Sequence, residues 1–164
     1  MNSPKNIDTI ASNYEIVMNI KKARNLQKKG IMGKPDPYVQ ITYDKMESKS
    51  KTVKNSYKPE WKYMETLKIS NDSPDNILIE VLDEDIGKDD NMGNLSLSVL
   101  DLIEKQSLVN QWMPLSDCMS GEILISVETH KIFKASKSST DTTDLIEKQS
   151  LVNQWMPLRV FSNK

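Results

Sequence analysis

Acidic residues crowd one short stretch of this sequence, and their spacing suits the binding of a hard cation. Five carboxylates fall between Asp83 and Asp90, which is costly unless something neutralises them, because neighbouring like charges repel. Asp83 and Asp85 alternate at the end of the apolar run 77–82, so on an extended chain their side chains point the same way. Asp90 returns from a glycine-containing loop. These oxygens predict a cage for Ca²⁺, and the alternative interpretation is a solvated acidic turn.

The rest of the sequence predicts the strands that must deliver this stretch. Short segments with alternating apolar and polar residues, or with clustered β-branched and aromatic residues, are separated by turn residues. These segments are 14–26, 37–43, 49–54, 61–69, 76–82, 94–99, 111–115 and 121–128. About eight short strands with turns between them predict an all-β, antiparallel sandwich.

Composition narrows the class of protein. A chain of 164 residues fits one domain with extensions, and no apolar run approaches the ~20 residues that span a bilayer. No apolar signal region follows Met1. Cys118 is the single cysteine, which excludes an internal disulfide and predicts a reduced thiol in the cytosol. One cysteine and one histidine cannot build a zinc site or a Cys/His nucleophile, so we expect no enzymatic activity.

Charge is distributed unevenly although the net charge is only −1. Basic residues outnumber acidic ones between Lys21 and Lys62, and the reverse holds between Asp72 and Glu104. This split predicts a basic face and an acidic pole, with ordinary solvated surface as the alternative. Nucleic acid is not an expected partner, because it would require a basic stripe without an acidic pole beside it.

Three ordered motifs resemble those of C2 domains. Residues 33–39 read Gly-Lys-Pro-Asp-Pro-Tyr-Val, and residues 55–61 read Asn-Ser-Tyr-Lys-Pro-Glu-Trp. The acidic stretch 83–93 follows at the distance the family shows. The resemblance is strongest to the first C2 domain of extended synaptotagmins and tricalbins, and it includes the later segments 101–104, 111–117 and 120–124. It implies an eight-stranded sandwich with Ca²⁺-binding loops at one end.

The resemblance also implies a set of metal ligands. The carboxylates carried over from the family are Asp36, Asp83, Asp85 and Asp90. The backbone carbonyl of Glu84 is the usual additional oxygen, and Asp89 competes with Asp90 for one role. Gly30 stands where many C2 domains have a further aspartate. We therefore expect one or two Ca²⁺ ions, bound weakly until a lipid phosphate completes the coordination shell.

Anionic phospholipid membranes are the partner that the family implies. Ca²⁺ cancels the acidic charge and offers open coordination positions to lipid. The apolar residues expected to dip into the membrane interface are Ile31, Met32, Ile86 and Met92. The expected headgroup-binding residues, which would attract phosphoinositides without Ca²⁺, are Lys49, Lys51 and Lys54.

The implied function is Ca²⁺-dependent membrane binding, with membrane tethering or lipid transfer at contact sites as the family's wider role. We expect a monomer in the cytoplasm that attaches peripherally to the plasma membrane or at endoplasmic-reticulum contacts. One alternative is a Ca²⁺-independent module that binds phosphoinositides or proteins. Another is the targeting domain of a larger enzyme.

The two ends of the chain differ from the central domain. Residues 1–13 are polar and predict a flexible arm, residues 14–130 form the predicted C2 domain, and residues 131–164 begin as a linker rich in Lys, Ser and Thr. Residues 144–158 then repeat 101–115 without a change. Because the first copy already fills its place in the sandwich, we expect residues 131–164 to stay outside the core. Pairing between molecules through this segment is the alternative.

Overall fold

The computed structural model describes residues 13–28, 33–105 and 107–132. Within them lie eight strands and one short helix. The strands are β1 (Asn13–Arg24), β2 (Pro37–Tyr43), β3 (Met46–Lys49), β4 (Glu60–Ile69), β5 (Asn76–Asp83), β6 (Asp90–Ser98), β7 (Ser107–Pro114) and β8 (Glu122–Ile132). The helix, α1 (Val99–Lys105), joins β6 to β7, and no helix in the described part is long and apolar enough to cross a membrane.

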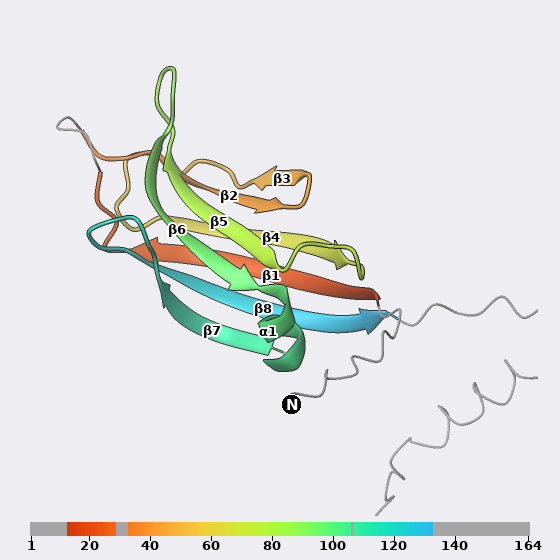
Figure 1. The fold of residues 1–164 in the computed structure, drawn as a ribbon. Helices are drawn as coiled ribbons and strands as arrows, with labels where there is room; N and C mark the ends of the chain where they lie inside the picture. The colour runs from red at the N-terminus through yellow and green to blue at the C-terminus, as the bar shows by residue number, and fades with distance from the viewer. Residues whose placement is uncertain (1–12, 29–32, 106, 133–164) are drawn as a thin grey trace, which may run out of the picture. The chain divides into compact units, whose positions relative to one another are not determined.

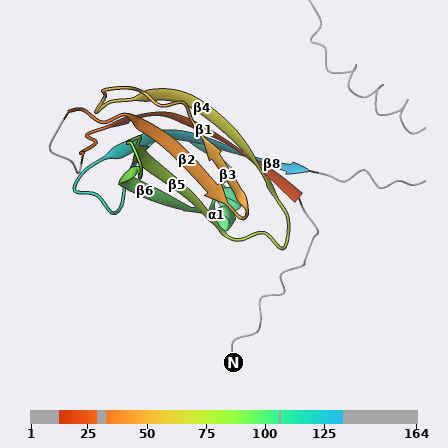
Figure 2. The same cartoon turned by 90° about the horizontal axis from the view of Figure 1, so that it is seen from above.

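The strands form two four-stranded antiparallel sheets, in the orders β4-β1-β8-β7 and β3-β2-β5-β6. Figure 1 shows the two sheets as layers, and Figure 2 shows them from above. The predicted eight-stranded antiparallel sandwich is therefore confirmed.

Alternation along the strands builds the core between the sheets. In β1, Ile16, Met18 and Ile20 are fully buried, while the residues between them reach the outer surface. Val39 and Ile41 of β2 are fully buried from the other sheet. Each such side chain contributes about 1.5–3 kcal/mol on leaving water, and this burial holds the sheets together.

The fold gathers the acidic stretch and its neighbours at one end of the sandwich. The β5–β6 loop lies at the end where β1 finishes and β2 begins, and α1 lies at the opposite end (Figure 1). Pro37 pairs with Asp83 in the β2–β5 ladder, so the first residues of β2 lie beside the last residues of β5. This pairing brings Asp36 next to Asp83.

The predicted strand over residues 49–54 is wrong, because the strand ends where it was expected to begin. Tyr43 pairs with Met46 across a two-residue turn, and Asp44 in that turn has a φ of 52°, which Asp tolerates better than most residues. The tight turn places β3 over Met46–Lys49. Residues 50–59 lie outside any strand and run along the start of β2.

Most of both chain ends falls outside the described residues. The predicted arm, residues 1–13, is described only at Asn13, which begins β1. The predicted domain end at residue 130 falls two residues before the end of β8 at Ile132. The separate status of the repeated segment, residues 144–158, stays a prediction.

A β-bulge near the acidic loop makes one glycine critical for stability. Gly93 has a φ of 137°, and a Cβ on it would lie 2.9 Å from both Cys118 Sγ and Leu115 Cβ. We expect Gly93→Ala to lower the free energy of unfolding by about 2–4 kcal/mol, because it adds a steric clash to backbone strain. Gly87 has a φ of 108° but open space around it. Gly87→Ala should therefore lower the free energy of unfolding by less, as measured by denaturant unfolding. Equal losses would show that the clash is relieved without cost.

Candidate functional site

Asp83, the last residue of β5, is the buried charge at the centre of the acidic end. Its side chain is only 1% exposed. Its Oδ1 accepts a hydrogen bond of 2.6 Å from the backbone N–H of Asp36. Its Oδ2 makes an ion pair with Lys28 Nζ at 3.1 Å but has no hydrogen bond of good geometry. A buried carboxylate needs a positive partner, and here Lys28 supplies it.

Lys28 reaches this position from the connection after β1. Its side chain is 14% exposed, so the ion pair with Asp83 is largely removed from water. The close contact with the Asp83 carboxylate raises the pKa of the Lys28 ammonium above its usual value, against the opposing effect of burial. The lysine is therefore firmly charged, and its ammonium group lies against a carboxylate that the resemblance implies to be a metal ligand.

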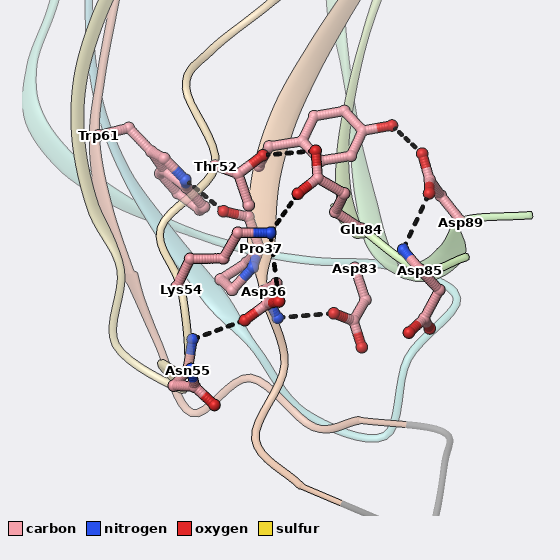
Figure 3. A network of polar contacts seen from close by, with 11 residues as sticks. Asp36, Pro37, Thr52, Lys54, Asn55, Trp61, Asp83, Glu84, Asp85 and Asp89 are labelled. Carbon is pink, nitrogen blue, oxygen red and sulfur yellow. Dashed lines mark hydrogen bonds and ion pairs between the residues drawn. The ribbon is translucent and has the colours of Figure 1, made fainter. Parts of the chain in front are cut away.

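A second lysine bridges two more acidic side chains. Lys54 Nζ lies 3.3 Å from Asp36 Oδ2 and also donates a hydrogen bond to Glu84 Oε2. The Asn55 N–H donates to Asp36 Oδ1 at 2.7 Å and is the main cause of the lowered pKa of that carboxyl. Lys54 in turn lowers the pKa of Glu84, whose Oε1 accepts from Thr52. Figure 3 shows this network.

Asp89 is held on the other side of the loop. Tyr38 Oη donates a hydrogen bond of 2.6 Å to Asp89 Oδ2, and the Asp85 N–H donates to Oδ1 at 3.1 Å. The Tyr38 contact is the first cause of the lowered pKa of Asp89. Burial, with Asp89 beside it, raises the pKa of the Tyr38 phenol. Asp89 therefore fastens the loop to β2 and faces away from Asp83 (Figure 3).

Asp90 is better placed than Asp89 to share a cation with Asp83. It is the cross-strand partner of Asp83 in the β5–β6 ladder, and directly opposed residues project from the same face. Asp90 is exposed, as is Asp85 in the loop. The preference for Asp90 over Asp89 as a ligand stays a prediction that this register favours.

The acidic side chains do not form a closed metal cage. Within the described residues, no group of three or more His, Cys, Asp or Glu side chains is arranged to hold a metal ion. The reason is visible in the contacts, since Asp36, Asp83 and Asp89 each bind separate donors. Their oxygens are nevertheless hard ligands of the kind Ca²⁺ prefers.

The predicted membrane-inserting residues differ sharply in their environment. Ile86, at the tip of the β5–β6 loop, is fully exposed. The prediction for Met92 is wrong, because this side chain is 1% exposed and lies in the core. Val81 pairs with Gly93 and Leu82 with Asn91, so Met92 is the extra residue of a β-bulge that turns it inward. Ile31, Met32 and Gly30 lie outside the described residues.

The predicted headgroup-binding lysines are also separated. Lys54 lies within the acidic network and is not a free cation on a basic strand. Lys49, at the end of β3, has its Nζ 5.3 Å from the centre of the Tyr38 ring. Lys51 follows outside the strand and is exposed. The headgroup role of Lys49 and Lys51 stays a prediction, without the shared strand face on which it was based.

Sequence reasoning missed two residues that organise this end. Lys28 lies 55 positions before its partner Asp83 in the sequence, and no local pattern marks a lysine in a loop as an ion-pair partner. Tyr38 belongs to the motif 33–39, but the sequence does not show that its hydroxyl reaches Asp89. Lys28 reaches from the connection after β1 to the end of β5 in the other sheet, and Tyr38 reaches the loop that follows its paired strand β5.

Comparisons with known proteins agree with this architecture. The family model of the C2 domain matches residues 14–115. The extended synaptotagmin-3 of Xenopus tropicalis is 30% identical over 114 residues, covering 69% of this chain and 13% of the relative. A C2 and GRAM domain-containing protein of Arabidopsis thaliana is 33% identical over 124 residues, covering 69% of this chain and 12% of the relative. The chain thus spans about an eighth of these relatives.

Solved structures show the same fold. The calcium-bound C2 domains A and B of extended synaptotagmin 2 superpose with a TM-score of 0.66 at 24% identity, covering 70% of this chain and 45% of that one. The C2 domain A of a plant extended synaptotagmin 1 gives a TM-score of 0.54 at 22% identity, covering 73% and 96%. The strand order, the acidic end and the match to the family model together show that this chain belongs to the C2 domain family.

Proposed function

We propose that this chain binds anionic phospholipid membranes through its acidic end in a Ca²⁺-dependent manner. The observation that carries the proposal is the buried Asp83 carboxylate, whose Oδ2 is balanced by an ammonium group and has no hydrogen bond. A site built around a buried charge of this kind requires a cation. The relatives in the family include a calcium-bound structure, which supports Ca²⁺ as that cation.

The residues that would hold Ca²⁺ are Asp36, Asp83, Asp85 and Asp90, with the carbonyl of Glu84. Bound Ca²⁺ would supply positive charge and open coordination positions for a lipid phosphate. For these oxygens to become available, Lys28 must leave Asp83 and Lys54 must leave Asp36. Both ammonium groups would then face solvent at the same end, where they attract anionic lipid.

Ile86 supplies the apolar contact in this proposal. It is fully exposed at the tip of the loop that carries Asp83 and Asp90 at its two ends. Placing this side chain in the interfacial region of the bilayer would add on the order of 1 kcal/mol from partial burial. Peripheral attachment of this kind would serve tethering or lipid transfer only together with the further parts that the much longer relatives contain.

A Ca²⁺-independent interaction is the second candidate, and one observation favours it. Lys28 and Lys54 already provide positive charge to the acidic end. A site neutralised by its own lysines repels anionic lipid less than a bare carboxylate cluster does. The same contacts thus fit both candidates. In the first, Ca²⁺ displaces the lysines when it binds, and in the second, the lysines take the place of Ca²⁺ permanently.

Co-sedimentation of the whole chain with phosphatidylserine vesicles, with Ca²⁺ and with chelator, separates these candidates. We expect binding with Ca²⁺, and a loss of about tenfold or more in Asp83→Asn/Asp85→Asn, because two charged ligands disappear. Asp44→Asn/Asp72→Asn removes the same charge from exposed positions outside the site and should bind normally. Wild-type binding that is equal with chelator would instead support the Ca²⁺-independent candidate.

Lys28→Met tests whether the lysine stands in for a metal ion. In chelator we expect the free energy of unfolding to fall by about 1–3 kcal/mol, because Asp83 remains buried without its partner. Saturating Ca²⁺ should restore most of that loss in thermal unfolding. Lys34→Met, an exposed neighbour in the same connection, should change little. A Ca²⁺-induced stabilisation of equal size in wild type and Lys28→Met would show that the two cations do not share the site.

Ile86→Ser tests the membrane contact apart from the charge. We expect vesicle affinity with Ca²⁺ to fall about fivefold, the equivalent of about 1 kcal/mol, while Ca²⁺ binding measured by calorimetry stays unchanged. The control is Leu100→Ser, a 62% exposed position on α1 at the opposite end. Equal affinity of Ile86→Ser and wild type would remove Ile86 from the contact surface.

A further inference from the structure

The outer face of the sheet β4-β1-β8-β7 carries a groove that the proposed function does not use. Its main hollow, of about 440 Å³, is lined by Asn19, Lys21, Lys22, Glu60, Lys62, Met64 and Leu124. A second hollow of about 260 Å³ shares Lys22 and Glu60 with it, and a third of about 250 Å³ shares Asn19, Lys21 and Met64. The shared residues make the three hollows neighbours on this face, and together they are called the groove here.

A β-bulge and register shifts in the strands determine which lysines line this groove. Ile20 pairs with Ile125 and Lys22 with Leu124, so Lys21 is an extra residue in β1. Consecutive strand residues normally face opposite sides, but the bulge lets both Lys21 and Lys22 line the main hollow. On β4, Lys62 has a φ of 51°, beside a shift in the β1–β4 register.

The neighbouring strand β7 is irregular at the same level. Asn110 has a φ of 50° where the β7–β8 register shifts, and its side chain accepts a hydrogen bond from Lys21 Nζ. Left-handed backbone at non-glycine residues costs about 1–3 kcal/mol each and gathers at functional sites. Lys21 and Lys62 line the main hollow and Asn110 lines the third, so three irregularities lie close together on a surface that only has to cover the core.

Among the described residues, the lining of the main hollow has more positive than negative charge. Lys22 lies 3.8 Å from Glu60, and both side chains are well exposed, so this pair is weak. Lys21 contacts the neutral Asn110. Lys62 makes no ion pair with any described residue. Three lysines thus line one hollow that has a single carboxylate among its lining residues.

The size and the charge of the hollow select a compact, multiply charged anion. Acidic side chains on one face of an extended peptide are about 6–7 Å apart, which spreads their charge along the chain. Two or more phosphates on one small headgroup concentrate the negative charge in a small volume instead. The second hollow extends the groove to Asn25 and Lys58, at the end of the sandwich that carries the acidic loop. A membrane in contact with that end can therefore present a headgroup to the groove.

We propose that this groove binds a membrane lipid whose headgroup carries two or more phosphates, with Lys21, Lys22 and Lys62 as the phosphate contacts. The inference rests on the proposed membrane function but not on its Ca²⁺ dependence. It locates headgroup recognition on the sheet opposite to the one that contains β3.

The test uses the whole chain and two kinds of vesicle. Vesicles with phosphatidylinositol 4,5-bisphosphate are titrated in chelator, and vesicles with phosphatidylserine are titrated with Ca²⁺. The groove variant is Lys21→Gln/Lys62→Gln. The matched control, Lys45→Gln/Lys68→Gln, removes the same charge from exposed lysines outside the groove, and Lys68 lies on the same strand as Lys62.

We expect the groove variant to lose on the order of ten- to thirtyfold in affinity for bisphosphate vesicles, and the control about twofold or less. Both should bind phosphatidylserine with Ca²⁺ as wild type does. Equal losses in the two variants would overturn the proposal in favour of diffuse attraction. Free inositol trisphosphate that binds as tightly as the vesicles would overturn the assignment to a lipid.

Two outcomes separate this inference from the proposed function. Wild-type binding to phosphatidylserine with Ca²⁺, but not to bisphosphate vesicles in chelator, would overturn the groove and leave the proposed function in place. Wild-type binding to neither vesicle would overturn both. Thermal unfolding of each variant checks that a loss of affinity does not come from a loss of fold.

Discussion

The buried ion pair between Asp83 and Lys28 is the constraint on which the acidic end depends. A carboxylate that is 1% exposed carries a desolvation cost of several kcal/mol, so it must keep a positive partner in every state of the protein. The backbone N–H of Asp36 orients it, and Lys28 balances its charge. Any metal ion that enters must therefore exchange with a lysine. Under the proposed function, the affinity for Ca²⁺ would then reflect a difference between two cations, and not the simple attraction of an empty acidic cluster.

Irregular strand positions connect the core to the two candidate surfaces. The bulge at Met92 turns an apolar side chain inward just after the loop that carries Ile86, so the loop is anchored in the core while its tip stays exposed. The bulge at Lys21 acts in the opposite direction and adds a basic side chain to the outer face. In both places one extra residue breaks the alternation of the strand, and the side chain it redirects changes from one environment to the other.

These irregularities also mark the limit of prediction from sequence. Alternation gave the number and approximate location of the strands, and the motifs at 33–39 and 83–93 correctly implied that Asp36 and Asp83 are neighbours. The same alternation misplaced β3, because the turn at Asp44 begins it three residues early. Met92 was expected at a loop tip but is buried, because β6 begins at Asp90 and a bulge beside Gly93 turns the side chain inward. The sequence did not indicate Lys28 as the partner of Asp83, because this contact joins a connection of one sheet to a strand of the other.

The fold shows where lysines of the basic segment of the sequence lie relative to the acidic end. Five lysines of the basic segment from Lys21 to Lys62 lie in two places. Lys28 and Lys54 neutralise the acidic end, and Lys21, Lys22 and Lys62 line the groove on the outer sheet. Because the first group already offsets part of the acidic charge, the end of the domain repels an anionic membrane only moderately before Ca²⁺ arrives. Attraction by the second group does not require Ca²⁺ and is screened by salt over roughly 8–10 Å. The two proposals together predict membrane binding that is graded by Ca²⁺, with a basal level set by the lysines of the groove.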